Sequence, residues 1–61
     1  MTIEDFNETK FTGNMRCIFE MRTREIFSAN FSQALIGLVD DRPGSEEGDI
    51  EWVRCENVAL I

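Results

Sequence analysis

Histidine and tyrosine are both missing from this 61-residue sequence, and tryptophan and proline occur once each. Without histidine, the common general acid–base pairs and catalytic triads cannot form, so we expect that the protein is not an enzyme. Cys17 and Cys55 lie 38 positions apart in the sequence and are too few to supply the four ligands of a structural zinc site. The composition therefore predicts neither a metal nor a cofactor.

Long apolar runs are missing as well. No segment approaches the roughly 20 apolar residues of a membrane-spanning helix, so no membrane partner is expected. The first five residues, Met1-Thr2-Ile3-Glu4-Asp5, are acidic where a secretory signal is basic, which predicts a cytoplasmic protein. In that compartment two buried free thiols are favoured, and a Cys17–Cys55 disulfide is the alternative.

Basic residues are scarce relative to acids: six against twelve, for a net charge of −6. This balance argues against binding to duplex DNA, which depends on cationic contacts with phosphates. Five of the six bases are arginines, which suit stacking and bidentate contacts at a local site. A chain of this length forms one domain, residues 1–61, with a thin core, so oligomerisation is the expected source of additional stability.

Local patterns predict a short helix followed by strands. Thr2-Ile3-Glu4-Asp5 has the form of a capping box, which predicts a helix over about residues 3–9. From Met15 to Met21 apolar residues alternate with mostly polar ones, the pattern of a strand. A tight turn is predicted at Thr23-Arg24, and a second strand at 25–31.

Residues 28–39 allow two interpretations. They form either a helix capped at Ser28 or Asn30, or the end of one strand, a bend at 30–33 and a buried strand at 34–40. Gly37 costs about 1 kcal/mol in a helix, and the neighbouring segments are β-rich, so strands are favoured. Residues 41–49 contain Pro-Gly, a second glycine and clustered acids, which predicts a surface loop.

The C-terminal run 50–61 predicts a strand, a bend at Cys55-Glu56-Asn57 and a second short strand. The chain as a whole therefore predicts a mainly β fold. A short N-terminal helix precedes a five-stranded, strongly bent small barrel with SH3-like or OB-like closure.

The segment Val53-Arg54-Cys55-Glu56-Asn57-Val58-Ala59-Leu60-Ile61 resembles the second sequence motif of the Sm and Sm-like proteins. That motif has an aliphatic residue, Arg-Gly-Asp/Asn-Asn and an aliphatic strand; here Cys55 and Glu56 replace its glycine and its acid or amide. The resemblance implies a ring of five to eight subunits, in which the fourth strand of one copy pairs with the fifth strand of the next. The implied edge comprises Val53, Val58, Ala59, Leu60 and Ile61.

The same resemblance implies binding of single-stranded, uridine-rich RNA. Arg54 would stack on a base, Asn57 would shape the turn, and Asn30 would join them from the region of the family's first motif. The first motif itself, a glycine in the second strand and an Asp-x-x-x-Asn, has no counterpart in 29–33. Two alternatives stay open: a ring without RNA binding, and a non-enzymatic adaptor or phage-type regulatory protein that contacts other proteins through an acidic rim.

Overall fold

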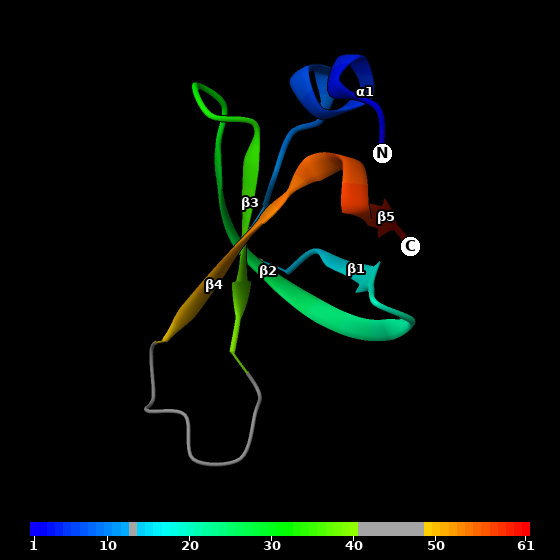
Figure 1. Ribbon diagram of the computed structural model, residues 1–61, viewed down its shortest axis with the longest axis vertical. Helices are drawn as coiled ribbons and strands as arrows, with labels where there is room; N and C mark the ends of the chain where they lie inside the picture. The colour runs from blue at the N-terminus through cyan, green and yellow to red at the C-terminus, as the bar shows by residue number, and fades with distance from the viewer. Residues whose placement is uncertain (13, 41–48) are drawn as a thin grey trace.

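The computed structural model describes residues 1–12, 14–40 and 49–61 (Figure 1). The fold is mainly β, with one short helix and five strands, as the sequence predicts. The elements are α1 (Ile3–Glu8), β1 (Arg16–Phe19), β2 (Arg22–Asn30), β3 (Leu35–Val39), β4 (Ile50–Arg54), the 3-10 helix η1 (Cys55–Asn57) and β5 (Val58–Leu60). The loop predicted at 41–49 falls almost entirely on residues 41–48, which lie outside the described part.

The helix α1 starts at the predicted cap. The Thr2 hydroxyl accepts a hydrogen bond from the Asp5 amide at 3.1 Å, which satisfies one of the free N–H groups of the first turn. Phe6 is fully buried and holds this six-residue helix against the sheet. A helix this short is not stable by itself, so its packing through Phe6 is what keeps it folded. No helix in the described residues is long and apolar enough to cross a membrane.

The five strands form one antiparallel sheet in the order β4-β3-β2-β1-β5. Strand β2 is nine residues long and takes part in both halves of it. Its first half pairs with β1 and its second half pairs with β3, and the register of the β2–β3 pairing shifts between Ile26 and Ser28. A bulge of this kind bends a strand and increases its twist. The result is the strongly bent sheet expected from the sequence, visible in Figure 1 as the long curve of β2.

The first hairpin turn differs from the prediction. The chain turns at Glu20 and Met21, whose φ angles are 51° and 65°, while Thr23 and Arg24 belong to β2. Two successive positive φ angles match the right-handed twist of a two-residue hairpin, which usually selects Asn-Gly. Glu20-Met21 lacks these residues, and the sequence therefore predicts the turn at Thr23-Arg24, three residues later than it occurs. As a consequence Met21, predicted on the strand, is 96% exposed.

The ambiguous segment 28–39 adopts the favoured β interpretation. Strand β2 ends at Asn30, whose Oδ1 accepts hydrogen bonds from the Ser32 amide, the Ser32 hydroxyl and the Gln33 amide at 2.7–3.2 Å. An asparagine side chain that replaces backbone partners in this way starts a turn. Ala34, at φ 56°, completes the turn, and β3 follows.

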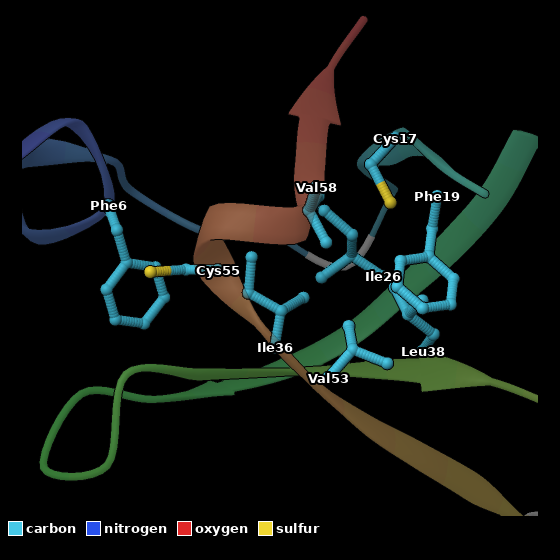
Figure 2. Packing of buried hydrophobic residues seen from close by; sticks show 9 residues of the cluster. All are labelled: Phe6, Cys17, Phe19, Ile26, Ile36, Leu38, Val53, Cys55 and Val58. Atoms are coloured by element: carbon cyan, nitrogen blue, oxygen red, sulfur yellow. The ribbon is translucent and has the colours of Figure 1, made fainter. Parts of the chain in front are cut away.

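The core gathers side chains from α1, from all five strands and from η1, as Figure 2 shows. Its buried members are Phe6, Cys17, Phe19, Ile26, Ile36, Leu38, Val53, Cys55 and Val58. Both cysteines are buried and free, which confirms the favoured prediction over the disulfide. In Figure 2 the two sulfur atoms lie on opposite sides of Val58.

One charged side chain lies within the sheet. Arg24 is 5% exposed; its Nη1 donates to Glu51 Oε1 and its Nη2 to the Val39 carbonyl, each at 3.0 Å. These hydrogen bonds tie β2 to β3 and β4, across 27 residues of sequence in the case of Glu51. A buried guanidinium is tolerated only with such partners.

Candidate nucleic-acid interface

The hairpin of β3 and β4 has two chemically different faces. Successive residues of a strand point to opposite sides, and directly paired residues share a side. Ile36 pairs with Val53, and both are buried in the core. The flanking pairs, Leu35 with Arg54 and Gly37 with Trp52, therefore lie on the outer side. We call this side, with the β2 residues that continue its rows, the outer face.

The outer face consists of eight residues in cross-strand rows. Ser28 pairs with Gly37 and Asn30 pairs with Leu35, so β2 extends two of the rows. The members are Ser28, Asn30, Leu35, Gly37, Val39, Ile50, Trp52 and Arg54. None of them is an acid, although the chain carries twelve. Arg54 is the single charged side chain among these eight.

Trp52 lies against the outer face and over Gly37. A methyl group built at Gly37 would lie 3.1 Å from indole atoms Cη2 and Cζ3, and 3.0 Å from Ile50 Cγ2. The distal ring of the indole therefore occupies the space that a side chain at position 37 would need. Trp52 remains 47% exposed in this position. The missing Cβ at position 37 is thus what allows the indole to lie so close to the sheet.

The structure brings together Asn30 and Arg54, two of the three residues that the sequence nominated. They flank Leu35 on neighbouring strands, 24 positions apart in sequence, in the row Asn30–Leu35–Arg54. A backbone hydrogen bond joins the same two regions: the Cys55 amide donates to the Ala34 carbonyl at 3.1 Å. The β2–β3 turn and the end of β4 are therefore neighbours.

Asn57, the third nominated residue, ends η1. Its side chain is exposed, like that of Arg54. The predicted bend between the last two strands is this single 3-10 turn, with the Val58 amide donating to the Cys55 carbonyl. Arg54 and Asn57 thus bracket one turn of helix, and only Asn30 comes from elsewhere in the chain.

The residues nominated as an oligomer edge divide into two groups. Val53 and Val58 are buried in the core of their own chain. Ala59, Leu60 and Ile61 are exposed, with Ile61 78% exposed beyond the end of β5. One edge of β5 is already occupied, because β5 pairs with β1 of the same chain from Phe19↔Val58 to Cys17↔Leu60. A neighbouring subunit could pair only with the other edge.

The remaining edges are on the two outermost strands. In residues 1–12, 14–40 and 49–61, β4 pairs only with β3, and β5 pairs only with β1. The start of β5 is fixed by the amino terminus: the Met1 ammonium donates to the carbonyls of Cys55 and Val58. Each outermost strand thus keeps one side without a β partner in the described chain.

Titratable groups add no further site in the described part of the chain. No group of three or more histidine, cysteine or acidic residues there has the arrangement of a metal site. Burial raises the pKa of the Cys17 thiol, and the nearby Arg24 guanidinium opposes that shift. A buried thiol with a raised pKa is a poor nucleophile, so Cys17 belongs to the hydrophobic core and not to a reactive centre.

Gly37, Leu35 and Trp52 are not predicted as parts of this surface from the sequence. The alternation in Ile50–Arg54 already puts Trp52 and Arg54 on one side of a strand. Gly37 had no sequence signal, because its position opposite Trp52 depends on the β3–β4 register. That register forms across a loop and cannot be derived from local patterns.

Comparison with models of protein families, with curated proteins and with solved structures yields no match for this chain. The likeness to Sm-like proteins therefore rests on the residues of the C-terminal motif and on the order of the elements.

Proposed function

We propose that the protein is a subunit of an Sm-like ring, assembled by strand addition, that binds single-stranded RNA at Asn30, Arg54 and Asn57. One observation supports the binding site: the β2–β3 turn lies next to the end of β4. Both segments are needed for a site that neither could form alone, and they are held together by the Ala34–Cys55 hydrogen bond.

The two outermost strands support the assembly. A strand with unpaired backbone groups is a template for another strand. Here β4 and β5 stand at opposite ends of the same sheet order, so the β4 edge of one copy can pair with the β5 edge of the next. Repeated head-to-tail contacts close into a ring when the rotation between copies permits. A ring of five to eight subunits is the size that the family resemblance implies.

The chemistry of the nominated residues supports single-stranded RNA as the ligand. An arginine can stack on a base and contact phosphate, and amide side chains can hydrogen-bond to base edges. The eight residues of the outer face include no acid, although the exposed Glu56 lies between Arg54 and Asn57 in the sequence. Single-stranded binding of this kind relies on stacking as well as on charge.

The test combines solution mass with RNA binding. Light scattering should give five to eight times the monomer mass, and a labelled oligouridine should show increased fluorescence anisotropy on binding. Arg54→Ala should weaken RNA binding severalfold, whereas Arg16→Ala, an exposed arginine on β1, should change it little. A monomeric mass, or no binding at high micromolar protein, would contradict the corresponding half of the proposal.

A second candidate is an adaptor that contacts proteins through an acidic rim. Its support is α1, which carries Glu4, Asp5 and Glu8 and no base. An adaptor of this kind should capture a specific partner with a basic surface in a pull-down, and Glu4→Gln with Glu8→Gln should weaken that capture. The same protein should leave oligouridine anisotropy unchanged, which separates the two candidates.

A further inference from the structure

The exposed indole of Trp52 has no role in the RNA site described so far. Almost half of its surface is open to solvent, whereas nine apolar residues of the described ranges are buried in the core. It is the only tryptophan, and it lies two residues before Arg54 on the same side of β4. Phe27 and Phe31 are exposed as well, at 63% and 51%, but Trp52 is the exposed aromatic that shares its face of β4 with the cationic side chain of Arg54, an arrangement that suits nucleic-acid binding.

We propose that Trp52 is a stacking platform for a nucleobase of a single-stranded nucleic acid, with Arg54 contacting the adjacent phosphate. This inference rests on the proposed RNA-binding function and deepens it, because it adds a residue and a face of the sheet to the site. The nominated residues lie at one end of the hairpin, and Trp52 extends the contact surface along β4, one row further.

The missing side chain at Gly37 lets the indole of Trp52 lie against β3. The benzene end of the indole sits where a side chain at position 37 would be, so the ring lies against β3. A ring supported from below by the sheet has its orientation fixed before a ligand arrives. Such preorganisation reduces the entropy lost on binding and favours affinity.

The spacing of Trp52 and Arg54 fits one nucleotide. Residues i and i+2 of a strand project from the same face about 7 Å apart. A base stacked on the indole therefore places a neighbouring phosphate within reach of the long Arg54 side chain. Arginine beside an aromatic platform is the combination that single-strand binders use to hold a base and its backbone together.

Asn30 supplies a polar group on β2, in the row of Arg54 and separated from Trp52 by β3. Its Oδ1 is engaged by the Ser32 and Gln33 groups of the β2–β3 turn. This leaves the Nδ2 amide as the end of the group that can donate to a ligand. A donor in that position suits the carbonyl oxygens of a pyrimidine base, and Ser28 adds a hydroxyl in the Trp52 row.

The charge pattern selects nucleic acid over a basic peptide. The eight residues of the outer face include one cation and no acid, on a chain of net charge −6. A basic partner would find no carboxylate on this face, whereas a phosphate finds Arg54. Strand addition at the β4 edge leaves the faces of the sheet uncovered, so each copy in a ring would present the same platform.

The experiment uses the full chain and an oligouridine of about eight nucleotides, a length within the usual range of single-strand sites. Binding is followed by anisotropy of a label on the RNA, and stacking by the emission of Trp52, the single tryptophan. We expect bound RNA to quench Trp52. Trp52→Leu should weaken binding about tenfold, while Trp52→Phe should keep most of the affinity.

An abasic strand of the same length separates stacking from a structural role. It keeps the backbone phosphates and lacks the bases, so it should bind the wild-type protein more weakly than oligouridine. If Trp52 stacks on a base, Trp52→Leu should not weaken abasic binding further. Met21→Ala, which alters an exposed side chain in the β1–β2 turn, is the matched control and should bind like the wild type.

Four results would overturn the inference. Equal oligouridine affinity for Trp52→Leu and wild type would exclude stacking while leaving the proposed function intact. An equal loss of oligouridine and abasic binding in Trp52→Leu would make Trp52 structural. A shift of Trp52 emission with protein concentration alone would assign the platform to a second copy. Complete absence of RNA binding in the wild type would remove the proposed function itself, and the platform with it.

Discussion

The two faces of the β3–β4 hairpin belong to the same strands but differ in the burial of their side chains. On the inner face Ile36 and Leu38 are completely buried, and Val53 is nearly so. On the outer face Trp52 and Arg54 are exposed. The inner face supplies the apolar burial that keeps so small a domain folded. Stability and candidate function are therefore assigned to alternate residues of the same strands, and substitutions on each face can test them separately.

The largest expected effect is the loss of an inner-face side chain. Ile36→Ala leaves a cavity in the core and should lower the free energy of unfolding by about 2–5 kcal/mol. A 61-residue domain has little stability to spare, so the variant should be largely unfolded at room temperature. Leu35→Ala, the neighbouring outer-face change, should cost well under half as much. Urea denaturation followed by circular dichroism measures both, and equal losses would contradict the division of the faces.

The ion pair between the buried Arg24 and the partly exposed Glu51 gives the next effect. Glu51→Gln removes the charged acceptor of Arg24, whose side chain is only 4% exposed, and should cost about 1–3 kcal/mol. Glu25→Gln, at an exposed position of β2, is the control and should stay within about 0.5 kcal/mol of the wild type. Chemical denaturation of both variants measures the difference. Similar stability of the two would mean that Arg24 does not depend on Glu51.

A smaller effect is expected at Gly37, on the outer face. Gly37→Ala introduces a methyl group about 3 Å from Ile50 and Trp52 atoms and should cost about 1 kcal/mol. The cost is modest because the crowded atoms belong to side chains that can move. In the Trp52→Leu background the same change should cost less, since the indole is gone. A double-mutant cycle measures this coupling, and additive losses would show that the indole does not rest on Gly37.

The smallest effect concerns the pH dependence of the core, through Cys17 on β1. Burial raises the pKa of Cys17 above its ordinary value of 9.0, so the folded state favours the neutral thiol. This contribution is complete below the pKa of the unfolded thiol and is lost as the pH rises from there through the folded pKa. Wild-type stability should therefore fall above about pH 9 more steeply than that of Cys17→Val. Thermal melts between about pH 8 and pH 10.5 test this, and parallel curves would exclude Cys17 as the cause.

Local signals predicted the elements whose causes are local. The Thr2 cap and the bend at 55–57 appear where expected, whereas the alternation over 15–21 forms a shorter strand, β1, that ends at Phe19. The β1–β2 turn was misplaced, because Glu20-Met21 adopts positive φ angles without the residues that usually do so. Pairing of the flanking strands imposed that turn, and a single sequence does not reveal such pairing.

The candidate site was predictable in part. Arg54 and Asn57 were nominated by their motif, and Asn30 by its place in the chain. That Asn30 and Arg54 share one cross-strand row, with Leu35 between them, follows from pairing through β3, and the contact between Trp52 and position 37 depends on the β3–β4 register. These relations join residues far apart in sequence, and no local pattern contains them.

By itself the sequence determined the class of fold, the two buried free thiols and the acidic charge, since these follow from periodicity, residue type and composition. Only the tertiary structure decided which residues share the outer face, why Arg24 is buried with Glu51, and which strand edges remain open. The physical reason is that register and burial are set by packing of the whole sheet. A one-residue slip between β3 and β4 would exchange the two faces, and only the complete core rules it out.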